Sequence, residues 1–314
     1  MLFHTKVPEN AVLIERSTML YEQFVQEIEM RVQMRLRDNQ KVYTHTATKN
    51  NGRKRQGLTF VETGINISPT VYLEEYYERY QRGYTMEEIV KQLLELYERI
   101  RFQHSWEGNF IQKYENVRGR IIYQLINREA NKELLQNVPH IPYLDLAIVF
   151  YVLIELDKEK DRMATMLIKN EHLGWWDVTV QDIYRMADEN TERILPYEFS
   201  NMLAVIEHML DDWEKREAEK EEEMYVLSNA VRNYGAAAIL YPNRMKAIAD
   251  YLGESFYVLP SSVHEVIIIP KSKAPSKRYL SRIVKEINGT QVKEEEVLSD
   301  CAYYYDKECG RLMI

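Results

Sequence analysis

Residues 256–270 read FYVLPSSVHEVIIIP and decide much of the fold. Two runs rich in β-branched and aromatic residues flank a Pro-Ser-Ser corner, and such runs favour strands. The spacing predicts an antiparallel hairpin that turns near Ser261 and Ser262. Both alternating sets of residues in the second run are largely apolar, so we expect its strand to be central and covered on both faces.

His264 and Glu265 open the second run directly after the two serines, which raises the question of a catalytic site. Adjacent strand residues face opposite ways, so the two side chains would not bind one metal from the same face. The letters HEVII also differ from the HExxH pattern of metalloproteases. Serine hydroxyls in such a corner ordinarily bond the local backbone. We therefore predict structural roles for His264 and Glu265 and keep a hydrolytic site as the alternative.

The flanking sequence alternates short strands with helices. Strands are predicted in MYVLSN, AAAILYP and CAYYYD, and helices near 242–252 and 275–288. Upstream, GRIIYQLIN, YLDLAIVFYVLI and RMATMLIKN are further strands, and TVQDIYRMADEN is a helix capped by Thr179 with Asp182. Short connections favour antiparallel pairing, so the sequence predicts an α+β fold of antiparallel sheets with flanking helices.

The N-terminal part is predicted to be mainly helical. Apolar residues recur every fourth position between about 16 and 38, which predicts a first helix. A β-hairpin follows, because alternating residues flank the turn signal Asn51-Gly52. The stretch SPTVYLEEYYERYQRGYTMEEIVKQLLELYERI then predicts two helices, the second of which begins with a capping box of Thr85 and Glu88.

These elements suggest three subdomains. They are a helical part with a β-hairpin (residues 1–117), a central α+β part (118–222) and a C-terminal α+β part (223–314). A predicted helix over about 197–222 ends in the charge run DDWEKREAEKEEE, which marks the second boundary. The segments MATMLIKN…IYRMADEN and AAAILYPN…MKAIADYL resemble each other, so a duplicated strand-strand-helix unit is an open alternative.

The composition is that of a globular protein, with 45% hydrophobic and 29% charged residues. A net charge of -8 disfavours indiscriminate binding to nucleic acid. No apolar stretch approaches the ~20 residues of a membrane span, and the N-terminus lacks a signal-peptide pattern. We expect a cytoplasmic protein without a membrane partner, in which Cys301 and Cys309 are free thiols.

Four basic residues cluster at the tip of the N-terminal hairpin. A solvated turn is the ordinary interpretation of such a cluster, and phosphate binding is the alternative. These candidate binding residues are Lys49, Arg53, Lys54 and Arg55.

Tyrosine is unusually frequent, with 23 residues against 8 phenylalanines. Tyr72, Tyr76, Tyr80 and Tyr84 are spaced by four, so they form one helical stripe that we expect to pack on the hairpin. Tyrosine is also common at recognition surfaces, which makes Tyr76 and Tyr80 candidate binding residues.

Common catalytic motifs are absent from the sequence: there is no GxxxxGK[ST], no GxGxxG and no GxSxG. His140 and Asp145 lie in VPHIPYLDLAIVF, at the mouth of a predicted buried strand, and are further candidates for a ligand or catalytic role. Two cysteines alone do not make a zinc site, which needs four ligands. We predict neither a metal nor a cofactor.

Several longer words of the sequence resemble a known family when they are read together. They are TKNNG, SPTVYLEEYYERYQRGYTMEEIV, VPHIPYLDLAIVFYVL, YGAAAILYPNRMKAIADYLGESFYVLPSSVHEVIIIP and EEVLSDCAYYYD. These words are similar to the domain-of-unknown-function family catalogued as 5688, found mainly in gut Firmicutes. The resemblance covers roughly residues 20–306 and implies a cytoplasmic bacterial protein that forms one integrated unit.

The resemblance implies no activity, cofactor or catalytic residue. It does single out the polar positions inside the matching words as the first to test: His140, Asp145, His264, Glu265 and Asp300.

Two functions remain open at this point. The first is a non-catalytic binding or regulatory protein, linked to mobile elements or phage conflict, whose partner is a protein rather than nucleic acid. The second is a hydrolytic enzyme with a His/acid site, since catalytic groups are often held at strand ends. Convergence of His140, Asp145, His264 and Asp300 in one cleft would favour the enzyme. The oligomeric state is left open.

Overall fold

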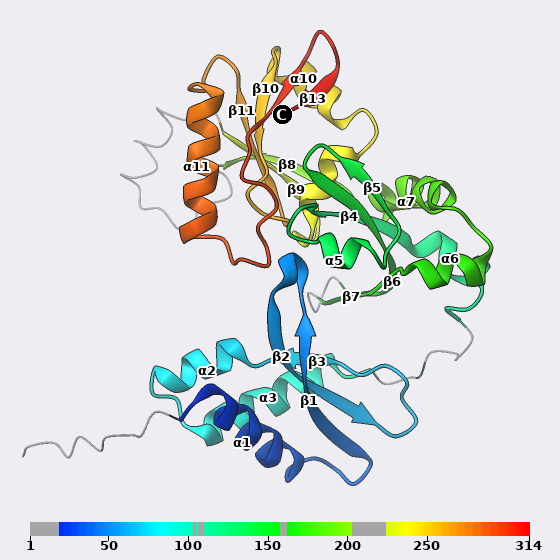
Figure 1. Ribbon diagram of the computed structural model, residues 1–314, viewed down its shortest axis with the longest axis vertical. Helices are drawn as coiled ribbons and strands as arrows, with labels where there is room; N and C mark the ends of the chain where they lie inside the picture. The colour runs from blue at the N-terminus through cyan, green and yellow to red at the C-terminus, as the bar shows by residue number, and fades with distance from the viewer. Residues whose placement is uncertain (1–18, 103–104, 106–109, 158–161, 203–223) are drawn as a thin grey trace, which may run out of the picture. The chain divides into compact units, whose positions relative to one another are not determined.

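The computed structural model describes residues 19–102, 105, 110–157, 162–202 and 224–314 (Figure 1). Contacts divide the chain into two compact units, one of residues 1–47 and 55–105 and the other of residues 48–54 and 106–314. Both units combine helices with antiparallel sheet, which confirms the predicted α+β class. The three subdomains stay a prediction.

The first unit packs three helices on a three-stranded sheet of order β1-β2-β3. Its core includes Phe24, Leu58 and Leu93, all of which are fully buried. The predicted capping box is confirmed, since the Glu88 amide donates to Thr85 Oγ1 at 3.2 Å. The elements are α1 (Tyr21–Gln33), β1 (Gln40–Thr48), β2 (Lys54–Glu62), β3 (Thr70–Tyr72), α2 (Glu74–Gln81) and α3 (Met86–Ile100).

The second unit contains two antiparallel sheets. In the four-stranded sheet, β6 pairs with β4 along one edge and with β5 and β7 along the other. Its strands are β4 (Ile121–Asn127), β5 (His140–Tyr143), β6 (Leu146–Asp157) and β7 (Arg162–Leu167). The six-stranded sheet has the order β13-β12-β10-β11-β9-β8. Its strands are β8 (Tyr197–Asn201), β9 (Tyr225–Asn229), β10 (Phe256–Leu259), β11 (Val266–Pro270), β12 (Tyr303–Asp306) and β13 (Arg311–Met313).

The two sheets of the second unit share one apolar core. Tyr123 and Phe150 of the first sheet and Phe256, Ile268 and Tyr303 of the second belong to one buried cluster. Burial of each such side chain stabilises the fold by ~1.5–3 kcal/mol. The helices are α4 (Tyr114–Val117), α5 (Lys132–Leu135), α6 (Asn170–Trp176), α7 (Val180–Ile194), α10 (Arg244–Leu252) and α11 (Lys277–Thr290). No helix in the described ranges is both long and apolar enough to cross a membrane.

The hairpin of β10 and β11 is confirmed, with Val258 opposite Ile268. Strand β11 lies between β10 and β9, and its Ile268 faces the shared core. On the other face Ile269 packs with Leu280 of α11, which lies beside β10 and β11 in Figure 1. The strand is therefore central and covered on both faces, as its apolar alternation predicted.

The placement of His264 and Glu265 inside this strand was wrong. Strand β11 begins at Val266, and both residues lie in the bend before it. The bend is held locally, because the His264 amide donates to Ser262 Oγ at 3.0 Å. The Ala236 amide also bonds the Val263 carbonyl at 3.2 Å, which ties the bend to a neighbouring segment.

Residues 235–240 form a 3-10 helix, η3 (Gly235–Leu240), where the sequence predicted a strand. A Cβ atom added to Gly235 would lie 2.1 Å from Ser228 Oγ, so the chain passes very close to β9 here. The small alanines that follow are buried in the shared core. The second copy of the suggested repeat therefore starts with a 3-10 helix rather than a strand.

The helix predicted over about 197–222 was wrong at its start, because residues 197–201 form β8. Register pairs such as Phe199 with Leu227 show that pairing with β9 determines the local structure. The charge run that follows lies outside the described residues. Strand β13, near the C-terminus, was not predicted.

Candidate functional site

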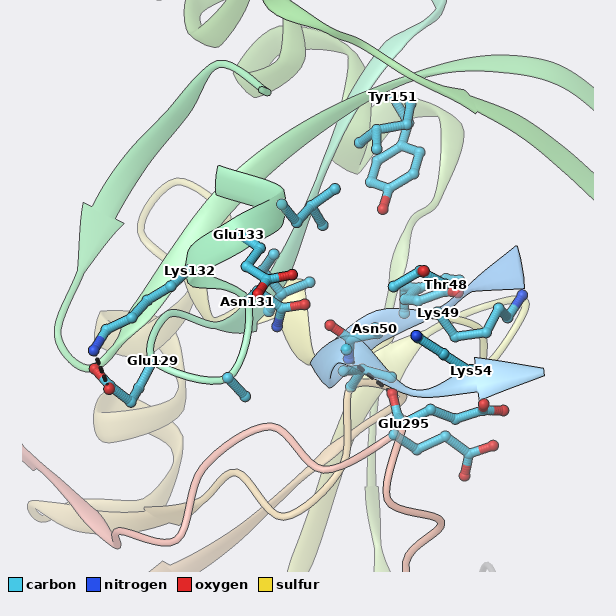
Figure 2. A pocket seen from close by; sticks show the side chains of 18 of the residues that line it. Thr48, Lys49, Asn50, Lys54, Glu129, Asn131, Lys132, Glu133, Tyr151 and Glu295 are labelled. Carbon is cyan, nitrogen blue, oxygen red and sulfur yellow. Dashed lines mark hydrogen bonds and ion pairs between the residues drawn. The ribbon is translucent and has the colours of Figure 1, made fainter. Parts of the chain in front are cut away.

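A pocket of about 1000 Å³ lies in the second unit (Figure 2). One wall is the hairpin tip, residues 48–54, which we call the tip segment. The opposite wall is the end of β4 with α5, and the floor includes Tyr151 of β6. The remaining lining comes from β7, from Tyr234 and His264, and from Glu295 and Glu296.

The tip segment is fixed by its asparagines. Asn51 has φ 58° and Gly52 φ 69°, the left-handed pair that the Asn-Gly turn signal predicted. Asn51 Nδ2 donates to the carbonyl oxygens of Glu294 and Val297, each at 2.8 Å. Asn50 Nδ2 donates to the Glu295 carbonyl at 2.7 Å (Figure 2). These bonds hold the wall in place without using its charged side chains.

The tip segment also bonds Asn131, the N-cap residue of α5. Asn131 Oδ1 accepts from the Asn51 amide at 2.9 Å, and Asn131 Nδ2 donates to Asn51 Oδ1 at 2.9 Å. Asn131 is 3% exposed, so this reciprocal pair is shielded from water and geometrically specific.

Several charged groups of the pocket already face another pocket residue. Lys132 pairs with Glu129, and His264 Nε2 lies 3.8 Å from Glu296 Oε1. Within the described parts of the chain, the side chains of Lys54 and Glu133 form neither a hydrogen bond nor an ion pair. Figure 2 shows the Glu133 carboxylate and the Tyr151 hydroxyl pointing toward the space between α5 and the tip segment that carries Lys54.

His264 is held in one orientation at the pocket. The Tyr234 amide donates to its Nδ1 at 3.3 Å, so the neutral ring carries its proton on Nε2, toward Glu296. Ser262 Oγ accepts from the His264 backbone amide rather than contacting the ring. The serine and histidine of the PSSVHE stretch therefore do not form a nucleophile-base pair.

Polar groups in and beside the pocket lack partners among the described residues. Burial, together with the nearby Tyr234, raises the pKa of Tyr151, and its hydroxyl has no hydrogen-bond partner among the described residues. Gln124 shares a sheet face with Ile126, which lines the pocket, and is 1% exposed. Neither its Oε1 nor its Nε2 finds a partner in the described chain, and Asn50 Oδ1 is likewise unsatisfied.

A second polar cluster surrounds Asp145 in the turn between β5 and β6. Ser299 Oγ donates to Asp145 Oδ2 at 2.6 Å, and the Tyr303 hydroxyl donates to Asp145 Oδ1. Burial and the neighbouring carboxylate raise the pKa of Tyr303. Ser299 is fully buried, so a substrate cannot reach it. Asp300 is bonded nearby, by Asn288 Nδ2 at 2.8 Å. This cluster joins the two sheets and is structural.

The candidate residues of the hypothetical hydrolytic site are thus separated. His264 lines the pocket, whereas Asp145 and Asp300 belong to the Ser299 cluster. His140 lies in β5, where its Nδ1 is 3.1 Å from the Val138 carbonyl. Glu265 lies half-buried in the bend before β11. The structure does not bring His140, Asp145, His264 and Asp300 into one cleft.

The structure places the four basic candidate binding residues in different surroundings. Lys49 and Lys54 line the pocket, while Arg53 pairs with Glu294 at 2.6 Å. Arg55 lies 3.7 Å from Glu74 within the first unit.

The two candidate tyrosines pack against the core of the first unit. The Tyr80 ring lies 5.5 Å from that of Phe24, and Arg79 lies over the Tyr76 ring. The helical stripe is incomplete, because Tyr72 lies in β3 and Tyr84 is 45% exposed.

Sequence reasoning missed Asn50, Asn131, Glu133 and Tyr151 as residues of the site. Of these, Asn50 had a usable signal, since it belongs to the word TKNNG beside the turn. The described residues contain no group of three or more His, Cys, Asp or Glu side chains that could hold a metal ion.

The fold and the pocket define an α+β protein of two antiparallel-sheet units with a polar pocket of mixed charge in the second unit. Residues 21–307 match a family described as "Family of unknown function (DUF5688)", and the chain belongs to this family. No curated protein and no solved structure matches the chain. The function must therefore be argued from the site itself.

Proposed function

We propose that the protein is a non-catalytic binding or regulatory protein that holds a polar ligand in the pocket of the second unit. The observation that carries this proposal is the pocket itself, at about 1000 Å³, with a hydrogen-bonded wall. The Glu133 carboxylate and the Tyr151 hydroxyl point into it and have no side-chain partner in the described parts of the chain. Ligand sites are commonly concave, largely preformed and furnished with a few such groups.

The local geometry favours binding over hydrolysis. A nucleophile needs a base within hydrogen-bond reach, and the His264 ring instead accepts from the Tyr234 amide. Ser299, the one buried serine bonded to an acid among the described residues, does not line the pocket and is fully buried. A binding role needs neither arrangement.

A cytoplasmic setting fits this proposal, because Cys301 and Cys309 are free thiols. A protein partner is favoured over nucleic acid, since acidic residues accompany the lysines of the pocket. The link with mobile elements or phage conflict stays a prediction.

The test is a thermal-shift screen with polar small molecules and short peptides. A bound ligand raises the unfolding temperature by mass action. In Thr165→Trp the indole obstructs part of the pocket, whereas Thr63→Trp places the same side chain at an exposed site outside it. We expect at least one ligand to stabilise the wild type and Thr63→Trp but not Thr165→Trp. Equal stabilisation of all three proteins, or of none, would contradict the proposal.

A further inference from the structure

We propose that the pocket recognises a peptide-like ligand that carries one carboxylate and one ammonium group, with Lys54 binding the carboxylate and Glu133 the ammonium group. This inference rests on the proposed function and names the chemical class of its ligand.

The charges of the pocket are the first argument. Lys132 and Glu129 form an internal ion pair, the Glu296 carboxylate faces Nε2 of the neutral His264 ring, and both Lys49 and Glu295 have partners. One cation and one anion then remain unpaired within the described chain, Lys54 on the tip segment and Glu133 on α5. Because they lie on opposite walls, a ligand with both charges can satisfy both at once (Figure 2).

The neutral polar groups are the second argument. The Tyr151 hydroxyl points into the space between the two charged walls, can donate and accept, and has no hydrogen-bond partner among the described residues. A peptide group offers one N–H donor and one C=O acceptor, and either can bond a hydroxyl. A backbone lying between the two charged walls would therefore find a hydrogen-bond partner there.

Ligands of a single charge fit the pocket less well. A phosphate near Lys54 would lie in a pocket that also holds Glu133, Glu295 and Glu296. A simple cation near Glu133 would face Lys54 and Lys49 in the same way. In both cases the pocket residues with the same charge as the ligand repel it. Such repulsion is how a site excludes ligands of the wrong charge.

A ligand with one carboxylate and one ammonium group could come from two sources. A free short peptide carries its charges on its two termini, whereas a segment of a partner protein carries them on side chains. The probes are therefore uncapped tri-alanine and the capped peptide acetyl-Lys-Ala-Ala-Glu-amide. Acetyl-tri-alanine retains the carboxylate alone, and tri-alanine amide retains the ammonium group alone.

Isothermal titration calorimetry on the full chain at low salt measures the four probes. We expect one of the two doubly charged probes to bind, and its identity shows the source. If uncapped tri-alanine binds, we expect each singly charged derivative to bind about tenfold more weakly.

Charge-removing variants assign the contacts. Lys54→Gln should weaken binding of the doubly charged probe about tenfold and should not change binding of tri-alanine amide, which has no carboxylate. Glu133→Gln should also weaken binding of the doubly charged probe, but should not change binding of acetyl-tri-alanine, which has no ammonium group. Lys285→Gln and Glu286→Gln, two exposed neighbours on α11 outside the pocket, are the matched controls. Failure of both doubly charged probes to bind, or equal binding to wild type and both pocket variants, overturns the inference. If another ligand still stabilises the wild type but not Thr165→Trp, the proposed function stands while this inference fails.

Discussion

Ser299 donates a 2.6 Å hydrogen bond to Asp145, a residue 154 positions earlier in the chain. The bond joins the β5–β6 turn of one sheet to the segment that leads into β12 of the other. Ser299 is also bonded by its backbone, since its amide donates to the Pro260 carbonyl at 2.9 Å. The hairpin corner that first drew attention to a catalytic site is thus tied to a structural carboxylate.

The first prediction concerns this bond. Ser299→Ala removes a donor from a half-buried carboxylate, and we expect the free energy of unfolding to fall by ~1–3 kcal/mol. Urea denaturation monitored by circular dichroism measures the change. Ser200→Ala, on edge strand β8, is the control and should change stability by less than ~0.5 kcal/mol. An unchanged unfolding midpoint for Ser299→Ala would show that the bond does not stabilise the fold.

The second prediction concerns Gly235, where an added Cβ would lie 2.5 Å from the Asn229 amide nitrogen and 2.6 Å from the His264 carbonyl oxygen. Both are backbone atoms that cannot rotate away, so we expect Gly235→Ala to destabilise the protein by ~1–3 kcal/mol or more. Gly174→Ala is the matched control, because it has open space and lies in α6. That variant should gain ~0.5–1 kcal/mol from helix propensity. Equal unfolding midpoints for the two variants would contradict the close approach.

The third prediction concerns pH. Burial lowers the pKa of His172, which is 6% exposed and accepts a bond from the Lys169 amide at 3.0 Å. The unfolded chain, with a histidine pKa of about 6.5, binds the proton more readily, so stability should fall as pH falls below that value. His172→Gln should flatten this slope between about pH 7 and pH 5 in urea denaturation. The exposed control His45→Gln should retain it, and a wild-type stability independent of pH in that range would refute the assignment.

The fourth prediction concerns His264. Glutamine offers an oxygen that can accept from the Tyr234 amide, so His264→Gln should keep the fold, with a change in unfolding free energy below ~1 kcal/mol. Ligand binding should also largely persist, which calorimetry can measure with any ligand found by the screen. If an activity is identified and this variant folds but loses it by orders of magnitude, the hairpin is an active-site element.

The fifth prediction concerns Gln124, whose buried amide lacks partners in the described chain. Gln124→Met keeps a similar shape and removes both polar atoms, so we expect stability to rise by ~1–3 kcal/mol. Thermal unfolding without ligand measures the effect. A loss of stability would instead show that a buried water bonds this amide.

Local patterns predicted the elements that are stabilised locally. The capping boxes at Thr85 and Thr179 and the Asn51-Gly52 turn depend on residues within a few positions of each other, so the sequence contains all the necessary information. The apolar alternation of β11 also predicted a central strand, because burial on both faces requires both sets of residues to be apolar.

Long-range contacts decide what the sequence did not predict. The strand predicted in AAAILYP is replaced by the 3-10 helix η3 because Gly235 lies against β9 and the bend at His264. The pocket escaped prediction for the same reason, since Asn51 meets Asn131 across 80 positions and Glu294 across 243. Lys49 and Lys54 were proposed for their charge, but Glu133 and Tyr151 carry no local pattern that separates them from ordinary surface and core residues.

The position of the tip segment in the sequence limits how the protein can be divided into fragments or recombined at the level of its gene. The second unit draws residues 48–54 from inside the first, so it does not correspond to one uninterrupted stretch of gene. A fragment starting at residue 106 would lack Asn51, which bonds Asn131, and would lack Lys54. A recombination event between the two coding halves would likewise separate the pocket from one of its walls. The two units are therefore expected to be inherited together, and an experiment that isolates the second unit has to supply the hairpin as well.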